Sequence, residues 1–148
     1  MGPSDVARVI ASECIAVRLR MIHRVVTGLY DAALRPHGLR VSQMNVLTAV
    51  AGAGAVRPAD LCRLLRLDKS TLSRDVERLR RRGWLEVARG DDARSHRLRI
   101  TPAGSALLAE CLPAWRKAQQ RARKLLGADA VAALAGVARA LWAEGAGG

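Results

Sequence analysis

The residues best suited to chemistry gather in a basic segment near the middle of the chain. Across residues 68–82 the apolar side chains of Leu72, Val76 and Leu79 recur at helical spacing, and Asp68 is a good N-cap. We therefore expect a helix here, which a following glycine ends. Turning the apolar stripe inward leaves an outward polar row of Lys69, Ser70, Thr71, Ser73, Arg74 and Arg78. Small hydroxyls permit close approach to a nucleic acid, and an Arg one turn later can bond both acceptors on a guanine edge.

A hairpin is expected directly after this helix. Residues 84–89 and 96–101 both alternate between apolar and polar side chains, with a connection too long for a tight turn. At its tip Asp92 and Arg94 are two residues apart, a spacing at which the carboxylate can brace the guanidinium. A braced Arg on a protruding tip suits the narrow, electronegative minor groove of DNA. We add Arg97, on the second strand, to the same expected contact.

The basic helix and the hairpin must be held in position by the elements around them. Pro58 sits at a first-turn position of a preceding helix whose Leu61 and Leu65 face inward, and a short break at residues 67–68 joins the two helices. Two short helices joined by a tight turn, the second of them basic, are typical of a helix-turn-helix. Arg80 to Arg82, at the end of the second helix, suit its last carbonyls or phosphate contact. A basic helix face alone often meets only water, but the hairpin that follows favours a contact role.

The two ends of the chain are expected to form long apolar helices. Residues 3–36 carry two adjacent apolar stripes along a single helix of roughly eight turns, and Ser42 caps a shorter helix after it. Thr101 and Pro102 start another long helix, which Pro113 should kink or divide. A last helix repeats apolar residues at Val131, Leu134, Ala138 and Leu141. One small domain rarely covers so much apolar surface, so part of it should contact a second subunit.

Composition narrows the class of partner. The chain has 148 residues, half of them apolar, only 3% aromatic, and a formal charge of +12. Such an excess of positive charge favours polyanions, although composition alone leaves DNA, RNA and an anionic membrane surface open. The apolar runs are too short to span a membrane, no export signal is evident, and three widely spaced cysteines suit reduced thiols. We therefore expect a cytoplasmic protein.

At these residues the chain resembles the MarR family (multiple antibiotic resistance regulators). Residues 67–74 are similar to the family's DNA-contacting helix, and the family pattern D-x-R…L-T-x-x-G is followed by Asp92, Arg94, Thr101 and Gly104, with Ile100 in place of Leu. The order of elements is similar over essentially the whole chain. Arg57 departs from the family, because a Ser or Thr often caps the following helix at that position. Arg57 can itself reach phosphate, but the usual cap is missing.

The resemblance implies a mainly α fold with a small β-wing. Residues 1–148 would form a single domain, with 39–101 as the winged helix-turn-helix and 1–38 and 102–148 as dimerisation helices. It implies a homodimeric transcriptional regulator that binds a palindromic operator in double-stranded DNA, most simply a repressor released by a small-molecule effector. The rival from another class is a sequence-independent architectural or RNA-binding protein, which would share the charge but not a reading helix.

The remaining candidate residues concern effectors and chemistry. Trp115 could line an effector pocket between the two halves, although tryptophans are more often core residues. Some relatives sense oxidants through a first-helix cysteine, and an oxidant-sensing regulator that uses Cys14 is the alternative within the same class. Aligning Tyr30 with the tyrosine of those relatives puts Ala16 at the thiol position, so Cys14 is more simply a packing residue. The other two cysteines also suggest core positions. His23, His37 and His96 lack metal-ligand spacing, and no catalytic motif appears, so we expect no metal, no cofactor and no enzyme activity.

Overall fold

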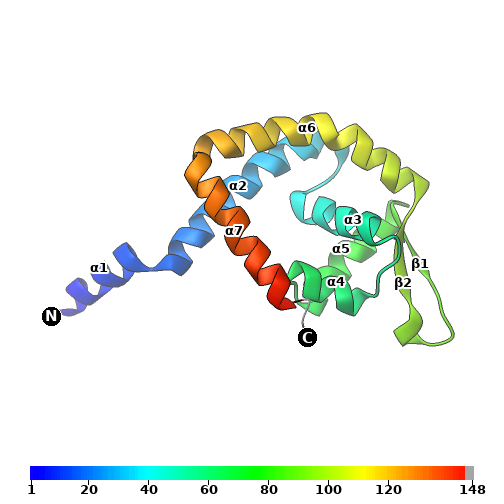
Figure 1. Cartoon of the computed structure of the whole chain (residues 1–148), viewed down its shortest axis with the longest axis horizontal. Coiled ribbons are helices and arrows are strands. Elements are labelled where there is room, and N and C mark those ends of the chain that lie inside the picture. Colours follow the sequence, from blue (N-terminus) through cyan, green and yellow to red (C-terminus); the bar gives the residue numbers. More distant parts are fainter. Residues whose placement is uncertain (146–148) are drawn as a thin grey trace.

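The computed structural model describes residues 1–145, with Ala93 described by its backbone alone (Figure 1). A central group of short helices and a hairpin lies between helical ends. The elements are α1 (Pro3–Glu13), α2 (Ile15–Leu34), the 3-10 helix η1 (Arg35–His37), α3 (Val41–Ala53), α4 (Pro58–Leu65), α5 (Lys69–Arg81), β1 (Leu85–Ala88), the 3-10 helix η2 (Ala93–Ser95), β2 (Arg97–Ile100), α6 (Pro102–Leu126) and α7 (Ala128–Gly145).

The central unit is a winged helix-turn-helix, so the fold class expected from the sequence is confirmed. Strand β1 pairs antiparallel with β2, with Leu85 opposite Ile100. The backbone of Val56 bonds that of Leu98 in both directions, at 3.1 and 2.8 Å, which adds a short third edge that the sequence pattern did not indicate. The leucines that α3, α4, α5 and the hairpin turn inward form the buried core, with Leu47, Leu61, Leu72, Leu79 and Leu98 among them.

The turn between α4 and α5 forms where the sequence predicts it. Arg66 adopts a left-handed conformation (φ 53°), and Asp68 is the N-cap of α5, accepting from the Thr71 amide at 2.7 Å. Gly83, with φ 75°, follows the end of the helix as expected. These local signals therefore fix the direction in which α5 leaves the turn.

The expected single helix over residues 3–36 is wrong. It breaks at Cys14, whose backbone is extended (φ −66°, ψ 110°), so that α1 and α2 are separate helices. None of the α1 residues is buried, so no packing within the chain holds it in line with α2. The Arg18 guanidinium donates to the Ser12 carbonyl across the break, which partners one of the carbonyl groups that the end of α1 leaves open.

Helix α3 also starts differently from the expectation. Its N-cap is Arg40 rather than Ser42, because two side chains take up the first amides. The Gln43 side-chain oxygen accepts from the Arg40 amide at 3.1 Å, and an Asp31 oxygen accepts from the Val41 amide at 2.8 Å. Asp31 lies on α2, so this cap also joins α2 to the central unit.

The second half of the chain forms a long arch. Helix α6 continues through Pro113 rather than ending there, and it bows over the top of the molecule (Figure 1). It packs along α2, and this packing offsets the hydrogen bond that proline removes. After Gly127, α7 descends to α4, where the Arg66 guanidinium donates to the Leu141 carbonyl at 2.7 Å. Trp142 is 57% exposed, so the expectation of a core role is wrong for it within one chain.

Helices α1, α2 and α7 expose large apolar side chains to solvent. Their exposed fractions lie between 40% and 70%, and the residues are Val6, Val9, Ile10, Ile15, Val17, Leu19, Met21, Ile22, Val25, Leu134, Val137, Leu141 and Trp142. Among the described residues no single helix is long and apolar enough to cross a membrane; α6 and α7 together reach that length and composition, but the chain bends by 108° between them.

Candidate nucleic-acid interface

The start of α5 is organised by one carboxylate. Asp68 accepts hydrogen bonds from the Ser70 hydroxyl (2.7 Å), the Thr71 amide (2.7 Å) and the Thr71 hydroxyl (2.8 Å). These three donors lower the pKa of Asp68 from 3.8 to about 2. Both hydroxyl groups donate their protons to Asp68, so the Ser70 and Thr71 oxygens keep their lone pairs for further hydrogen bonds.

The outward row of α5 is exposed as the sequence predicts, apart from Thr71. Lys69, Ser70, Ser73, Arg74 and Arg78 are exposed, and Thr71 is half-buried. The inward stripe is also confirmed for Leu72 and Leu79, while Val76 is only partly buried.

A buried carboxylate on the flank of α5 escaped the sequence analysis. Asp75 is only 6% exposed, and its oxygen lies 3.9 Å from an Arg78 nitrogen. The i, i+3 spacing of the two residues is the signal that would have found it. Arg78 therefore shares its charge with Asp75, whereas Arg74 forms no ion pair within the described part of the chain.

The arginines at the end of α5 have partners other than those expected. Arg80 and Arg81 donate to the Glu77 carboxylate at 3.3 and 3.0 Å, and the Arg82 guanidinium lies 5.2 Å from the centre of the Trp84 ring. These contacts lower the pKa of Glu77. The expected bonding of these arginines to the last carbonyls of the helix is therefore wrong, because an acid one turn back and an aromatic ring lie within closer reach.

The wing tip differs from the expectation in one contact. Asp92 does not brace Arg94 among the described residues; its carboxylate accepts from the Ser95 amide at 2.9 Å and caps η2. A backbone amide three residues on is a pre-formed donor, whereas a long guanidinium must be ordered to reach the same oxygen. Arg94 is exposed at the tip, and Arg97 on β2 is half-buried and donates to the His96 carbonyl at 3.4 Å.

Helix α4 lacks a side-chain cap, as its unusual N-cap residue predicts. Arg57 makes no capping hydrogen bond, and its side chain pairs instead with Asp60 at 3.6 Å. Arg63 pairs with the same carboxylate. Pro58 at the first position removes one amide that would otherwise need a partner.

The candidate effector and redox residues lie away from α5. Trp115 packs against the ring of Tyr30, with centroids 6.5 Å apart, and the Tyr30 hydroxyl donates to Gln119, so these residues join α2 to α6. Burial raises the pKa of the Tyr30 hydroxyl. Cys14 is half-buried at the break between α1 and α2, outside any helical stripe. Effector binding at Trp115 and a redox role for Cys14 stay predictions.

The other two cysteines pack as expected. Cys111 is fully buried, and burial raises the pKa of its thiol. Cys62 is half-buried against the core. Both thiols therefore lie where a free cysteine acts as a small apolar side chain.

Comparison with known proteins is consistent with this arrangement. A family model described as the MarR family matches residues 37–95. The multiple antibiotic resistance protein MarR of Salmonella typhimurium is 30% identical over 116 residues, which cover 77% of this chain and 81% of that protein. A mutant of Escherichia coli MarR, solved in complex with operator DNA, superposes with a TM-score of 0.77 at 25% identity, covering 89% of this chain and 96% of that one.

A second solved structure is similar to the same extent. Bordetella bronchiseptica BpsR, described in terms of regulation of its DNA binding by 6-hydroxynicotinic acid, has a TM-score of 0.76 at 25% identity, covering 88% of this chain and 94% of that one. Sequence identity, chain coverage and fold agree, and this chain therefore belongs to the MarR family of transcriptional regulators.

Proposed function

We propose that this chain is a cytoplasmic repressor that binds a palindromic operator in double-stranded DNA as a homodimer. The observation that carries the proposal is the start of α5, where Asp68 fixes the first turn and Arg74 extends from the exposed face without an ion pair among the described residues. A basic helix that follows a tight turn and precedes a β-wing has the geometry of a major-groove reader.

The proposed contacts divide between the two elements. Arg74, one turn into α5, is the residue we assign to base reading in the major groove, where base pairs are fully distinguishable. The wing would add a minor-groove and phosphate contact. The full proposed set is Lys69, Ser70, Thr71, Ser73, Arg74, Arg78, Asp92, Arg94 and Arg97.

Dimerisation is proposed for the helical ends, residues 1–38 and 102–148, with residues 39–101 as the DNA-binding region of one domain. The exposed apolar side chains of α1, α2 and α7 support this, because an apolar surface of that extent marks an interaction site. A two-fold dimer also presents two copies of α5, which suits a palindromic operator.

Release by a small molecule is the last part of the proposal. Its support comes from BpsR, the similar protein whose DNA binding is described as regulated by 6-hydroxynicotinic acid. We infer that a small organic effector controls DNA binding by this chain too. Screening of small molecules against the protein–DNA complex would identify it.

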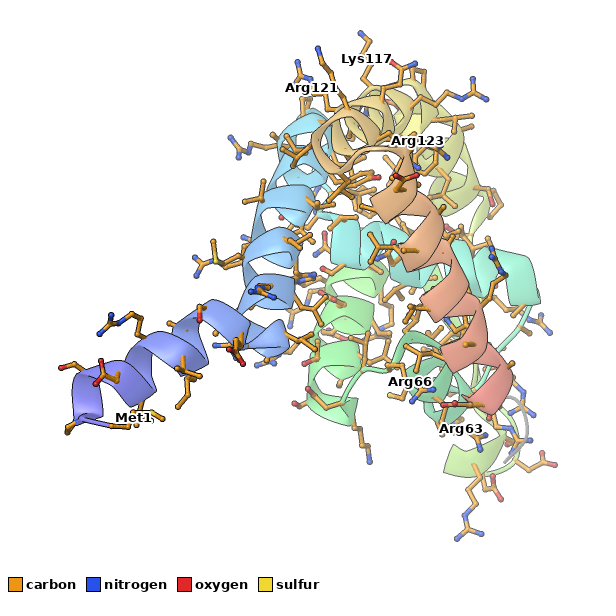
Figure 2. All side chains as sticks on the ribbon, turned by 60° about the vertical axis from the view of Figure 1, so that its left-hand side comes forward. Met1, Arg63, Arg66, Lys117, Arg121 and Arg123 are labelled. Carbon is orange, nitrogen blue, oxygen red and sulfur yellow. The ribbon has the colours of Figure 1, made fainter. Side chains whose placement is uncertain are left out.

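The experiment begins by selecting bound duplexes from a random-sequence pool with the full chain. Wild type and Arg74→Ala are then titrated against the selected duplex and a scrambled one. We expect Arg74→Ala to lose about 1–3 kcal/mol on the selected duplex and much less on the scrambled one. Arg121→Ala is the matched control, because it removes the same charge from α6, at the other end of the molecule from Arg63 of α4 (Figure 2).

Two results would contradict the proposal. One is a pool from which no preferred sequence emerges, and the other is an equal loss on both duplexes in Arg74→Ala. Either result would favour a sequence-independent nucleic-acid-binding protein, whose affinity depends on charge alone.

A further inference from the structure

Beside α5 lies a polar hollow that the proposed DNA contacts do not account for. It has a volume of about 600 Å³ and lies where η1, the start of α3 and the flank of α5 meet. Its wall includes Arg35, Arg40, Gln43 and Arg78, with Asp31 at one side. A smaller hollow of about 210 Å³ adjoins it, with Gln43 and Arg78 in its wall as well.

The arginines of this hollow have few partners. Neither the Arg35 nor the Arg40 side chain forms a hydrogen bond or an ion pair within residues 1–145. Arg78 has only the 3.9 Å contact with Asp75. Several arginines of α4 and α5 do pair closely with acids, as Arg63 does with Asp60 and Arg81 with Glu77. Three arginines, from η1, the N-cap of α3 and α5, therefore line a space in which Asp31 is the one acidic residue among those in its wall.

Gln43 supplies a neutral donor at the base of the hollow. Its side chain is 9% exposed, and its oxygen accepts from the Arg40 amide at 3.1 Å, so its nitrogen is the free end. That nitrogen forms no hydrogen bond with the described residues. Because no fully buried side-chain polar atom among them lacks a partner, this nitrogen is not fully buried, and Gln43 lines both hollows. An amide donor in the wall of a cationic hollow is suited to an oxygen acceptor.

The nearby acids only partly balance this charge. An Asp31 oxygen accepts from the Val41 amide at 2.8 Å, and Asp75 is nearly buried beside Arg78. Gly38 lies between the two hollows with φ 72°, and the Arg82 guanidinium comes within 3.2 Å of where a Cβ at this position would lie. A fourth guanidinium is thus packed next to the hollow, and the net charge around it remains positive.

We propose that this hollow binds a phosphate group, held by Arg35, Arg40 and Arg78 and by the Gln43 amide. Guanidinium and amide donors are the groups that bind phosphate oxygens in proteins. The volume exceeds what one phosphate occupies, so the site has room for the molecule that carries it. Two sources share this chemistry: a backbone phosphate of DNA lying along α5, and a free phosphate or phosphorylated small molecule. The DNA source rests on the function proposed above.

The first experiment titrates inorganic phosphate into the full-length protein and follows the side-chain amide signals of Gln43 by NMR. In wild type these signals are expected to shift and saturate. Gln43→Glu keeps the oxygen that caps α3 but replaces the amide donor with a negative charge. The affinity for phosphate, measured by isothermal titration calorimetry, should therefore fall by roughly tenfold or more. Arg35→Gln should weaken it as well. Arg121→Gln removes one charge from α6 and should leave binding unchanged.

The second experiment separates the two sources. Affinity for a mixed-sequence duplex is measured at several salt concentrations, since phosphate contacts do not depend on sequence. If the phosphate belongs to DNA, Arg35→Gln lowers the slope of log affinity against log salt by about one per protomer relative to Arg121→Gln. If the source is a free phosphate, phosphate binding is lost in Arg35→Gln while the slope is unchanged.

Either of those outcomes supports the site. The proposal is overturned if phosphate causes no shift at Gln43 in wild type, or if Gln43→Glu binds phosphate as tightly as Arg121→Gln does. The phosphate titration uses no DNA, so the phosphate site can be refuted while the duplex selection still supports DNA binding. Equally, the phosphate site can be supported while the duplex selection fails.

Discussion

Gly104 lies so close to the backbone of Trp84 that a Cβ on Gly104 would be 2.3 Å from the Trp84 carbonyl oxygen. The same carbonyl accepts from the Thr101 amide at 3.1 Å, and the Thr101 hydroxyl donates to the Gly83 carbonyl at 2.6 Å. These contacts fasten the start of α6 to the base of the wing. They also give a physical reason for glycine at the end of the L-T-x-x-G pattern, because the wing backbone occupies the space of a side chain.

Gly104→Ala should therefore destabilise the fold. The contact involves backbone rather than a flexible side chain, so the added methyl group forces α6 away from the wing, and we expect a loss of about 1–3 kcal/mol. Urea denaturation gives the free energy of unfolding. Gly52→Ala is the control, because nothing lies within 4 Å of its Cβ position in α3, and alanine should stabilise that helix by about 0.5–1 kcal/mol. Equal effects of the two substitutions would refute the close-packing argument.

The Asp68 cap should make stability depend on pH in acid. Hydrogen bonds from the Ser70 hydroxyl and from the Thr71 amide and hydroxyl lower the pKa of this carboxyl from 3.8 to about 2 in the folded chain. A pKa lower in the folded than in the unfolded state adds stability above about pH 4, which is lost as the pH falls toward 2.

Asp68→Asn tests this pH dependence, since the amide oxygen can still accept from the Thr71 amide. The difference in free energy of unfolding between wild type and variant should shrink as the pH falls through that window. Denaturation curves at a series of pH values measure it. A difference that stays constant from pH 5 to pH 2 would mean that the carboxylate charge contributes nothing at this cap.

How well each element could be predicted from the sequence depended on how local its signal was. Helix α5 could be predicted almost entirely, because its cap Asp68, its inward Leu72 and Leu79 and the glycine after it all lie within the segment. The start of α3 could not, because the residue that caps Val41 is Asp31, ten positions earlier on α2. The break at Cys14 carries no proline or glycine and left no trace in the apolar pattern.

The candidate site shows the same division. Exposure of Lys69, Ser73 and Arg74 followed from helical periodicity alone. The hydrogen bond from the Ser95 amide to Asp92 could not be predicted in this way. Two donors compete for this carboxylate, and only the folded η2 brings the Ser95 amide within reach. The polar hollow beside α5 joins residues from η1, α3 and α5, so no single motif could have indicated it.

The proposed dimer predicts a specific effect at Leu19. This side chain is 53% exposed on α2, in the apolar surface that we propose contacts the partner subunit. Leu19→Glu should shift the protein from dimer to monomer in sedimentation velocity, because the new charge loses its water at the interface. Ala51→Glu is the control, because Ala51 is exposed on α3, outside both helical ends. A wild type that sediments as a monomer at micromolar concentration would exclude the dimer.

The last prediction distinguishes the contribution of the wing (β1 and β2) to DNA binding from that of α5. Arg94 is exposed at the wing tip, where the minor groove distinguishes little beyond A·T from G·C pairs, so its contribution should come from charge and groove shape. Arg94→Ala should therefore weaken binding to selected and scrambled duplexes by similar factors, and lower the slope of log affinity against log salt by about one per protomer. Arg74→Ala should instead reduce the preference for the selected duplex. Arg121→Ala, which removes an exposed charge from α6, should change neither quantity. If Arg94→Ala reduces the preference as strongly as Arg74→Ala does, the wing reads sequence directly, and the division of roles between the two elements is wrong.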